Sequence, residues 1–307
     1  MLKFFKTWTL PISMLAGAIG YFVFANVTFL EPTKPFMYTL IAYLTPFLIF
    51  AQLLLTFCKI SVRELMPSPW HGWLLLIQAV SSLVLAALLL WLPMREEYRD
   101  VFEGAAAAVI TGKLGGSASS LTTYTLLSNL LAAIVVPLVF PLVEPHAEIT
   151  FFAAFLKILG KVFPLLLFPF FLALFLRRFM PPIHRFLAGL RDMAFYLWAV
   201  ALAIVTGQTV KSLVNSEAEI YVEILIALGG LITCIAQFYW GKRIGTKYND
   251  RISAGQALGQ KNTVLAIWMS YTYLNPLSSV GPGSYVLWQN IFNSYQLWKK
   301  RNKELEN

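Results

Sequence analysis

Long apolar runs separated by short polar segments dominate the sequence. Many runs hold about twenty residues, the length at which a helix crosses ~30 Å of hydrocarbon. The polar segments between them hold turn-forming residues such as Glu31-Pro32 and Asn275-Pro276. The pattern predicts an all-α polytopic membrane protein with ten spans. These are residues 9–30, 36–57, 70–93, 101–124, 126–143, 150–176, 193–214, 219–240, 252–273 and 279–297.

Two of the predicted spans are interrupted by glycine and small polar residues. Span four contains residues 111–120 (TGKLGGSASS) and span nine contains residues 255–263 (GQALGQKNT), with one lysine in each, Lys113 and Lys261. A charge at mid-span costs on the order of 3 kcal/mol and by default marks a functional site. Paired interruptions at matching positions of two halves indicate a transporter's binding site. We therefore expect both stretches to meet in the membrane core and to bind the substrate.

The spans divide into two halves, residues 1–147 and 148–307, with five spans in each. Because five is odd, the second half enters the membrane from the opposite side. The sequence therefore predicts two inverted repeats in which the discontinuous spans four and nine cross. Spans four and five share about forty residues, so we expect one of them to be short or broken.

The lysines and arginines are distributed unevenly between the two predicted sides of the membrane, with sixteen on one side and four on the other. The larger set is Lys3, Lys6, Lys59, Arg63, Arg177, Arg178, Arg185, Arg191, Lys242, Arg243, Lys247, Arg251, Lys299, Lys300, Arg301 and Lys303. The smaller set is Lys34, Arg95, Arg99 and Lys211. This asymmetry predicts that both termini are cytoplasmic, in a bacterial-type inner membrane. The net charge of +9 is then a topology signal, not a sign of nucleic acid binding.

The composition agrees with a membrane protein and speaks against an enzyme. Hydrophobic residues make up 58% and charged residues 13%, against about 45–50% and 25% in soluble domains. The three histidines, at positions 71, 146 and 184, are expected in loops and do not have the spacing of metal ligands. The two cysteines do not indicate a disulfide framework. The sequence lacks a P-loop motif, so ATP-driven pumping by this chain is not expected. No cofactor is expected, and the oligomeric state stays open.

Several polar residues within the spans also have simpler structural explanations. Lys157 and Lys161 lie four apart, and we expect them to reach the interface by snorkelling. Ser119 and Ser120 are small enough to allow close helix packing. Lys261 would be a purely structural cation if it only capped the carbonyls of a broken helix.

Several motifs, in the right order and over nearly the whole chain, resemble those of the bile acid:sodium symporter family. Gly115-Gly116-Ser117-Ala118-Ser119-Ser120 followed by Thr123-Tyr124 resembles that family's Gly-Gly-Thr-Ala-Ser-Asn…Thr-Tyr signature. Gly259-Gln260-Lys261-Asn262-Thr263 resembles its Glu-x-Gly-Met-Gln-Asn-Ser crossover. Residues 49–65 resemble the end of its second span, and residues 285–290 (YVLWQN) fit its closing span.

The resemblance implies a panel domain of spans one, two, six and seven beside a core domain of the other six. It places the substrate near the crossing of spans four and nine, with two sodium ions behind it. By position, the implied substrate groups are Lys113, Ser119, Ser120, Lys261 and Asn262. The implied remnants of the sodium sites are Gln78, Ser119, Thr123 and Gln256. In span five, Asn129 is a candidate ligand only.

This chain departs from the family at residues that bind ions. The family's crossover glutamate aligns with Ala257 and its glutamine with Lys261. The proline before the double glycine is Leu114, and the asparagine after the first serine is Ser120. Sodium binds oxygen ligands, and an alanine offers only its backbone carbonyl. On a continuous helix Lys261 would share a face with Ala257, so its ammonium could replace the charge of the ion.

The resemblance therefore implies a secondary transporter of a small or amphipathic organic anion that works by alternating access. We expect transport without a requirement for sodium. Either Lys261 keeps its charge and transport is facilitated or by exchange, or Lys261 gains and loses a proton during the cycle. The alternative is a channel or facilitative uniporter for organic anions. The implied partners are the organic anion and the lipid bilayer.

Overall fold

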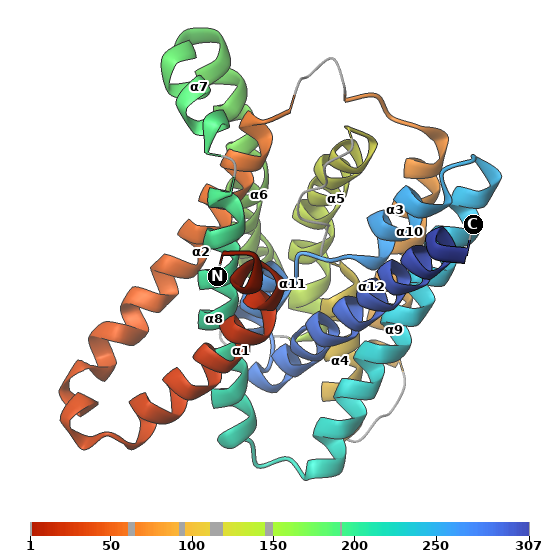
Figure 1. Ribbon diagram of the computed structural model, residues 1–307. Coiled ribbons are helices and arrows are strands. Elements are labelled where there is room, and N and C mark those ends of the chain that lie inside the picture. Colours follow the sequence, from red (N-terminus) through yellow and green to blue (C-terminus); the bar gives the residue numbers. More distant parts are fainter. Residues whose placement is uncertain are drawn as a thin grey trace.

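The structure is a computed structural model that describes residues 2–60, 65–91, 96–110, 119–144, 150–190 and 192–306 (Figure 1). Every regular element within these residues is helical. The first half contains α1 (Leu2–Asn26), the 3-10 helix η1 (Thr28–Thr33), α2 (Lys34–Cys58), α3 (Pro69–Trp91), α4 (Glu96–Ile110) and α5 (Ser119–Val143). The second half contains α6 (Phe151–Phe179), α7 (Pro181–Gly189), α8 (Met193–Val214), α9 (Ile220–Lys247), α10 (Arg251–Gly259), α11 (Thr263–Tyr273), η3 (Pro276–Ser279) and α12 (Val280–Glu306).

Within the described ranges, six helices are long and apolar enough to cross a membrane, which fits an integral membrane protein. They are Thr28–Cys58, Pro69–Trp91, Ser120–Val143, Phe151–Phe179, Met193–Val214 and Ile220–Lys247. The sequence predicted a helix in each of these places, so the helical class and these six segments are confirmed. Helices α1, α4, α10, α11 and α12 occupy the other predicted spans, but α4, α10 and α11 have only 15, 9 and 11 residues.

The predicted boundary between spans four and five is wrong. It was expected at residues 124–126, yet α5 runs without a break from Ser119 to Val143. No glycine or proline interrupts the hydroxyl-rich segment Thr122–Thr125. The Thr125 hydroxyl donates a 2.9 Å hydrogen bond to the Leu121 carbonyl, as hydroxyl side chains do within membrane helices. The expectation that one of the two spans would be short or broken stays a prediction, because residues 111–118 after α4 lie outside the described residues.

Two histidines expected in loops lie in helices instead. His71 is in the first turn of α3, which begins at Pro69, and His184 is in α7, which begins at Pro181. Proline is well suited to the first turn of a helix because its missing N–H has no partner to lose there. Pro69 and Pro181 therefore start these two helices.

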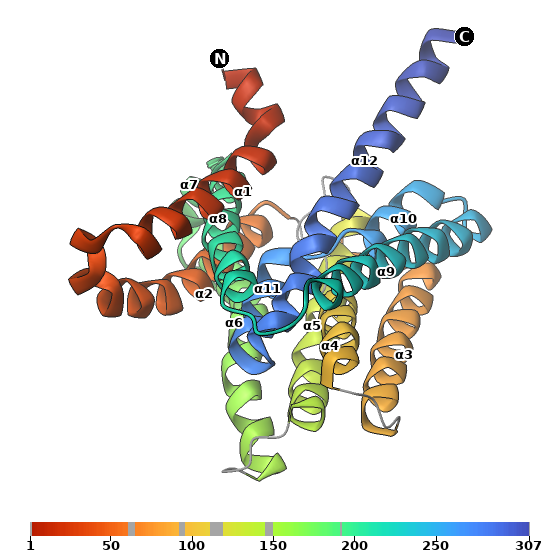
Figure 2. The same cartoon turned by 90° about the horizontal axis from the view of Figure 1, so that it is seen from below.

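The helices form two groups, which contact each other through α5 and α6 (Figures 1 and 2). In one group α1 packs on α8, and α2 packs on α6 and α8. In the other group α3, α4, α5, α9, α10 and α12 pack on one another. Helix α11 lies between the groups and contacts α2 and α8 on one side and α4 and α12 on the other. Helices α1 and α8 cross closely at Gly17, because this residue has no side chain. A Cβ atom there would collide with the Ala203 carbonyl.

Hydrogen bonds join the helix ends at one end of the molecule, which we call the α7 end. Arg177 at the end of α6 donates to the carbonyl of Ile60 after α2, at 3.1 Å. Trp73 at the start of α3 donates to the Tyr248 hydroxyl after α9, at 3.0 Å. The ends of α2, α6 and α9 therefore lie on one side, with α7 at the top of Figure 1.

The opposite end, which we call the η3 end, is joined in the same way. Asn215 after α8 donates to the Tyr21 hydroxyl of α1 at 3.1 Å. Asn275 before η3 donates to the Asp100 carboxylate of α4 at 3.0 Å. The ends of α1, α8 and α11 and the start of α4 thus lie on the other side of the molecule.

Candidate functional site

The second polar stretch is a true helix break at residues 260–262. Helix α10 ends at Gly259, Gln260 is extended (φ −94°, ψ 125°), and α11 begins at Thr263. The Asn262 side-chain oxygen accepts a 3.2 Å hydrogen bond from the Leu265 N–H and so caps α11. A side chain at Gly259 would collide with the ring of Phe238. The predicted interruption of span nine is therefore confirmed, whereas its predicted partner at 111–118, including Lys113, lies outside the described residues.

Lys261 lies buried in this break, with 5% of its surface exposed. Its backbone N–H donates a 3.0 Å hydrogen bond to the side-chain oxygen of Gln289. Its ammonium nitrogen is buried and has no hydrogen-bond partner among the described residues. Because α10 ends at Gly259, the helical spacing that would place Lys261 over Ala257 does not extend to it. A buried cation without a partner is costly, which favours a functional role.

A cavity of about 320 Å³ lies beside the break, and we call it the break cavity. Helices α2 and α8 form one wall, and residues 260–261 with α12 form the other. The lining is Gln52, Thr56, Ala194, Phe195, Trp198, Gln260, Lys261, Gln289, Asn290 and Asn293. The side-chain oxygen of Gln52 is buried without a partner among the described residues. The cavity thus combines a lysine with several amides, and such donors can bind a carboxylate or sulfonate.

Gln256, one of the predicted sodium ligands, lies one turn before the end of α10. Its side-chain nitrogen donates a 3.1 Å hydrogen bond to the side-chain oxygen of Asn293, which lines the break cavity. This bond ties α10 to α12. In this arrangement Gln256 supports the wall of the cavity.

Gln78 is 1% exposed in α3, and its side-chain oxygen already accepts two hydrogen bonds. The donors are the hydroxyls of Tyr124 at 3.0 Å and Ser128 at 2.8 Å, both on α5. An amide oxygen has two lone pairs, so both are in use. Thr123, another predicted ligand, is buried beside Tyr124 at 4% exposure. The Gln78 oxygen could bind sodium only by giving up one of these bonds.

Ala257, at the position of the family's glutamate, is completely buried in an apolar cluster. Its neighbours there include Trp70, Leu74, Tyr124 and Leu258. Of these side chains only Tyr124 carries an oxygen, and its hydroxyl donates a hydrogen bond to Gln78. The place where the resemblance implies a carboxylate therefore has an apolar packing core.

Ser120 is paired with a histidine that the sequence pattern did not single out. The Ser120 hydroxyl lies 3.2 Å from His71 Nε2, and His71 Nδ1 accepts a 2.9 Å hydrogen bond from the Ser68 N–H. With Nδ1 accepting, neutral His71 carries its proton on Nε2 and donates it to Ser120. His71 is 1% exposed and fastens the start of α5 to α3. Ser119 begins α5, but its side chain is outside the described set.

Two further buried polar groups lie within the helices. Glu103 in α4 is 1% exposed and accepts a 2.9 Å hydrogen bond from the Ser278 hydroxyl and a 3.3 Å bond from Arg99. It was not predicted as a site, and it joins α4 to η3. Asn129 in α5 is fully buried, and neither polar atom of its amide has a partner among the described residues.

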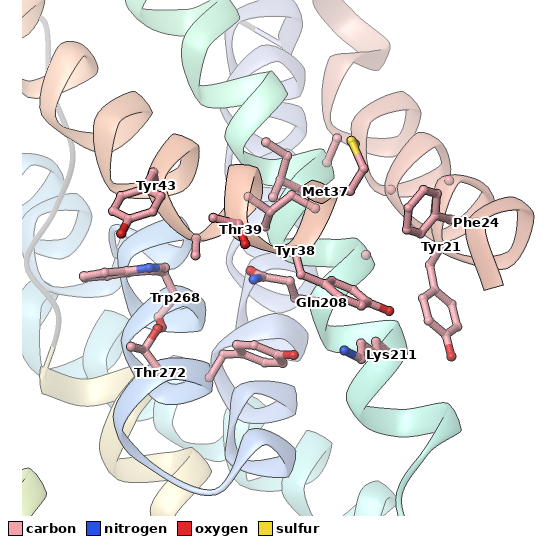
Figure 3. Close-up of a pocket in the computed structure, with 18 of the residues that line it drawn as sticks. Tyr21, Phe24, Met37, Tyr38, Thr39, Tyr43, Gln208, Lys211, Trp268 and Thr272 are labelled. Carbon is pink, nitrogen blue, oxygen red and sulfur yellow. The ribbon is translucent and has the colours of Figure 1, made fainter. Parts of the chain in front are cut away.

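A second and larger cavity, of about 970 Å³, lies among α1, α2, α8 and α11 (Figure 3). We call it the α1 cavity. Its polar lining includes Gln208 and Lys211 of α8 and Lys161 of α6, and its walls include Tyr38 and Trp268. Lys161 was predicted to reach the interface, and it lines this cavity.

The two cavities lie at opposite ends of the same helices. The break cavity touches residues 52–56 of α2 and 194–198 of α8, towards the α7 end. The α1 cavity touches residues 37–43 of α2 and 203–211 of α8, towards the η3 end. Between these segments lie residues that all belong to one buried hydrophobic cluster. They are Leu48, Ile49, Ala201, Leu202, Val264 and Leu265.

A scan against protein-family models found no match, and a search of curated proteins found none. The likeness to bile acid:sodium symporters therefore rests on the motifs in the sequence. Among the described residues no group of three or more His, Cys, Asp or Glu side chains could hold a metal ion. The described residues therefore offer a ligand one lysine and several amide side chains beside a helix break.

Proposed function

We propose that this chain is a secondary transporter of a small or amphipathic organic anion, similar to bile acid:sodium symporters and working by alternating access. The observation that carries the proposal is Lys261, a buried lysine in the middle of a broken helix that also lines a cavity. Irregular backbone at membrane depth is tolerated where protein or a water-filled cavity receives it. A cation surrounded by amides there favours an anionic substrate.

The pattern of helix contacts supports two inverted repeats. If α1, α2, α3, α4 and α5 correspond to α6, α8, α9, α10–α11 and α12, several contacts have a counterpart, although the extensive α5–α6 contact has no comparable α12–α1 contact among the described residues. The α1–α8 contact is matched by α6–α2, the α3–α5 contact by α9–α12, and the α4–α12 contact by α10–α5. Such matching is what a pseudo-two-fold axis in the membrane plane would produce. In this proposal the repeats are residues 1–147 and 148–307 and provide ten spans.

The apolar layer between the two cavities favours a carrier over the alternative, a channel. An open channel for organic anions needs a polar or wet path, whereas Leu48 and Ile49 of α2 and the cluster residues of α8 and α11 that face them are packed and apolar. In a carrier, the substrate would reach the break from one end at a time as the two helix groups move relative to each other. A facilitative uniporter or exchanger is the form of carrier that needs no coupling ion.

The proposal does not include a requirement for sodium. Ala257 is packed in an apolar cluster, and the Gln78 oxygen already accepts two hydrogen bonds. Lys261 would then supply the positive charge near the substrate, either permanently or by taking up and releasing a proton. In this proposal the α7 end faces the cytoplasm of a bacterial-type inner membrane, since the positively charged loops lie there.

Proteoliposomes that contain only this chain test the proposal. Radiolabelled taurocholate and pantoate serve as probes of two organic-anion sizes. We expect saturable uptake of at least one probe, and faster uptake when the same unlabelled anion is inside the vesicles. Flux that is not saturable and gains nothing from internal substrate would show a channel. Folded protein that moves neither probe, nor any of a panel of other carboxylates and sulfonates, would contradict the proposed function.

A further inference from the structure

The α1 cavity has its mouth on the bilayer-facing surface of the protein. It lies among α1, α2, α8 and α11, beside the hairpin in which η1 joins α1 to α2 at the lower left of Figure 1. Tyr43 on its wall is 75% exposed. Leu15 and Ile19, which flank it on α1, are each 60% exposed. Large apolar side chains exposed to this extent on a membrane helix face lipid chains.

Lys211 is the lysine of the cavity that lies near the helix ends, whereas Lys161 lies ten residues into α6. Lys211 lies in the last turn of α8, next to Asn215, which bonds to Tyr21 at the η3 end. The cavity extends from there along α8 to Ala203, about 12 Å deeper at 1.5 Å per residue. At that depth the opposite walls include Tyr43 and Trp268. A ligand would therefore have its polar group at the membrane interface and its apolar part towards the bilayer centre.

The charged end of the cavity lacks an anion. No described carboxylate forms an ion pair with Lys211 or Lys161. The Lys211 ammonium lies 4.0 Å from the centre of the Tyr38 ring, a cation–π contact that leaves its charge available. The side-chain oxygen of Gln208, one turn away, is buried and has no partner among the described residues, so it can accept a hydrogen bond from a hydroxyl of the head group. Figure 3 shows Gln208 and Lys211 projecting from α8 into the cavity, with Tyr38 beside Lys211.

We propose that the α1 cavity binds a membrane lipid with an anionic head group. The lipid enters between α1 and α2, its head group binds Lys211, with Gln208 beside it, and one acyl chain lies against Trp268. The volume of about 970 Å³ is at the upper end of the range for ligand sites, which suits a chain and part of a head group. A water-soluble anion would not need a mouth on the bilayer-facing surface. This site does not depend on the proposed transport.

Quenching of Trp268 fluorescence by brominated acyl chains tests the lipid site in nanodiscs of phosphatidylcholine. At equal mole fraction, brominated phosphatidylglycerol should quench more strongly than brominated phosphatidylcholine. Trp268→Phe should remove the quenching that depends on head-group charge, which assigns that signal to the cavity. A third set of nanodiscs contains dibromostearate. Stronger quenching by dibromostearate than by brominated phosphatidylglycerol would identify a free fatty acid, and not a phospholipid, as the bound anionic lipid.

Lys211→Gln should weaken the preference for the anionic lipid about fivefold, the effect of one cation near the membrane surface. Lys157→Gln is the matched control, because Lys157 is exposed on α6 and does not line the cavity. As a second measurement, anionic lipid that remains bound in neutral detergent should fall in Lys211→Gln and persist in Lys157→Gln by mass spectrometry. Equal quenching by both lipids, or an unchanged preference in a folded Lys211→Gln variant, would overturn the proposal.

Discussion

The Tyr285 hydroxyl donates a 2.8 Å hydrogen bond to the carbonyl oxygen of Gly259, the last residue of α10 before the break. The last carbonyls of a helix have no partner within the helix. Tyr285 is completely buried, so water cannot replace it. Helix α12 thus supplies the partner that allows α10 to end inside the protein.

Tyr285→Phe should therefore lower the stability of the protein by about 1–3 kcal/mol, the cost of an unsatisfied buried acceptor. The measurement is thermal unfolding in detergent, followed by the fluorescence of a thiol-reactive dye on the buried cysteines. Tyr239→Phe is the control, since Tyr239 is 54% exposed and its hydroxyl accepts a hydrogen bond from Arg243 near the surface. Equal effects of the two substitutions would show that the Gly259 carbonyl does not need this partner.

The Gln78 side-chain oxygen can be tested as a structural acceptor. Gln78→Ala leaves the hydroxyls of Tyr124 and Ser128 without their acceptor, and should destabilise the protein by about 1–3 kcal/mol. Gln78→Glu keeps an acceptor for both donors and should cost less. Because the oxygen is occupied, unfolding temperatures of the unmodified protein should agree in sodium chloride and choline chloride. A clear stabilisation by sodium would indicate a bound ion, since binding to the folded state raises its stability.

The parts of the fold that the sequence predicted are those set by local patterns. Apolar runs placed α2, α3, α6, α8 and α9 to within about three residues at both ends, except that α9 continues beyond residue 240 to Lys247. The agreement arises because hydrocarbon thickness fixes helix length. Glycine and small polar residues placed the break at Gln260–Asn262, where close contact with Phe238 excludes a side chain from Gly259.

The parts that the sequence could not predict depend on residues far apart in the chain. Glu103 is stabilised by Ser278, 175 residues away, and His71 by Ser120, 49 residues away. No local spacing indicates such pairs. The boundary of α5 was wrong for a related reason, because hydroxyl side chains form loops or continue a helix depending on their partners.

Cysteine labelling tests the proposed topology. Asn215→Cys at the η3 end should react with a membrane-impermeant maleimide in intact cells, and Tyr248→Cys at the α7 end only after permeabilisation. The two positions mark opposite ends of α9. The unmodified chain is the background control, since Cys58 and Cys234 are both buried. The reverse labelling pattern would place the positively charged loops outside and remove the basis for the inverted repeats.

Lys261→Gln separates a functional lysine from a structural one. Lys261 is buried without a partner for its ammonium among the described residues, so its neutral replacement should not lower stability and is expected to raise it. The same variant should lose most transport of an organic anion, because the positive charge beside the substrate is gone. In one preparation of this variant, the unfolding temperature should therefore rise while proteoliposome uptake falls.

Uptake by the unmodified protein should also be similar in sodium and choline buffers, since Ala257 provides no carboxylate. Lys157→Gln serves as the control for loss of a lysine at an exposed position and should keep its uptake. A drop in both stability and uptake for Lys261→Gln would mean that the ammonium holds the break together, which is the structural explanation. Steep sodium dependence together with normal uptake by Lys261→Gln would instead assign coupling to an ion, because neither a fixed nor a titrating charge at residue 261 would then be needed.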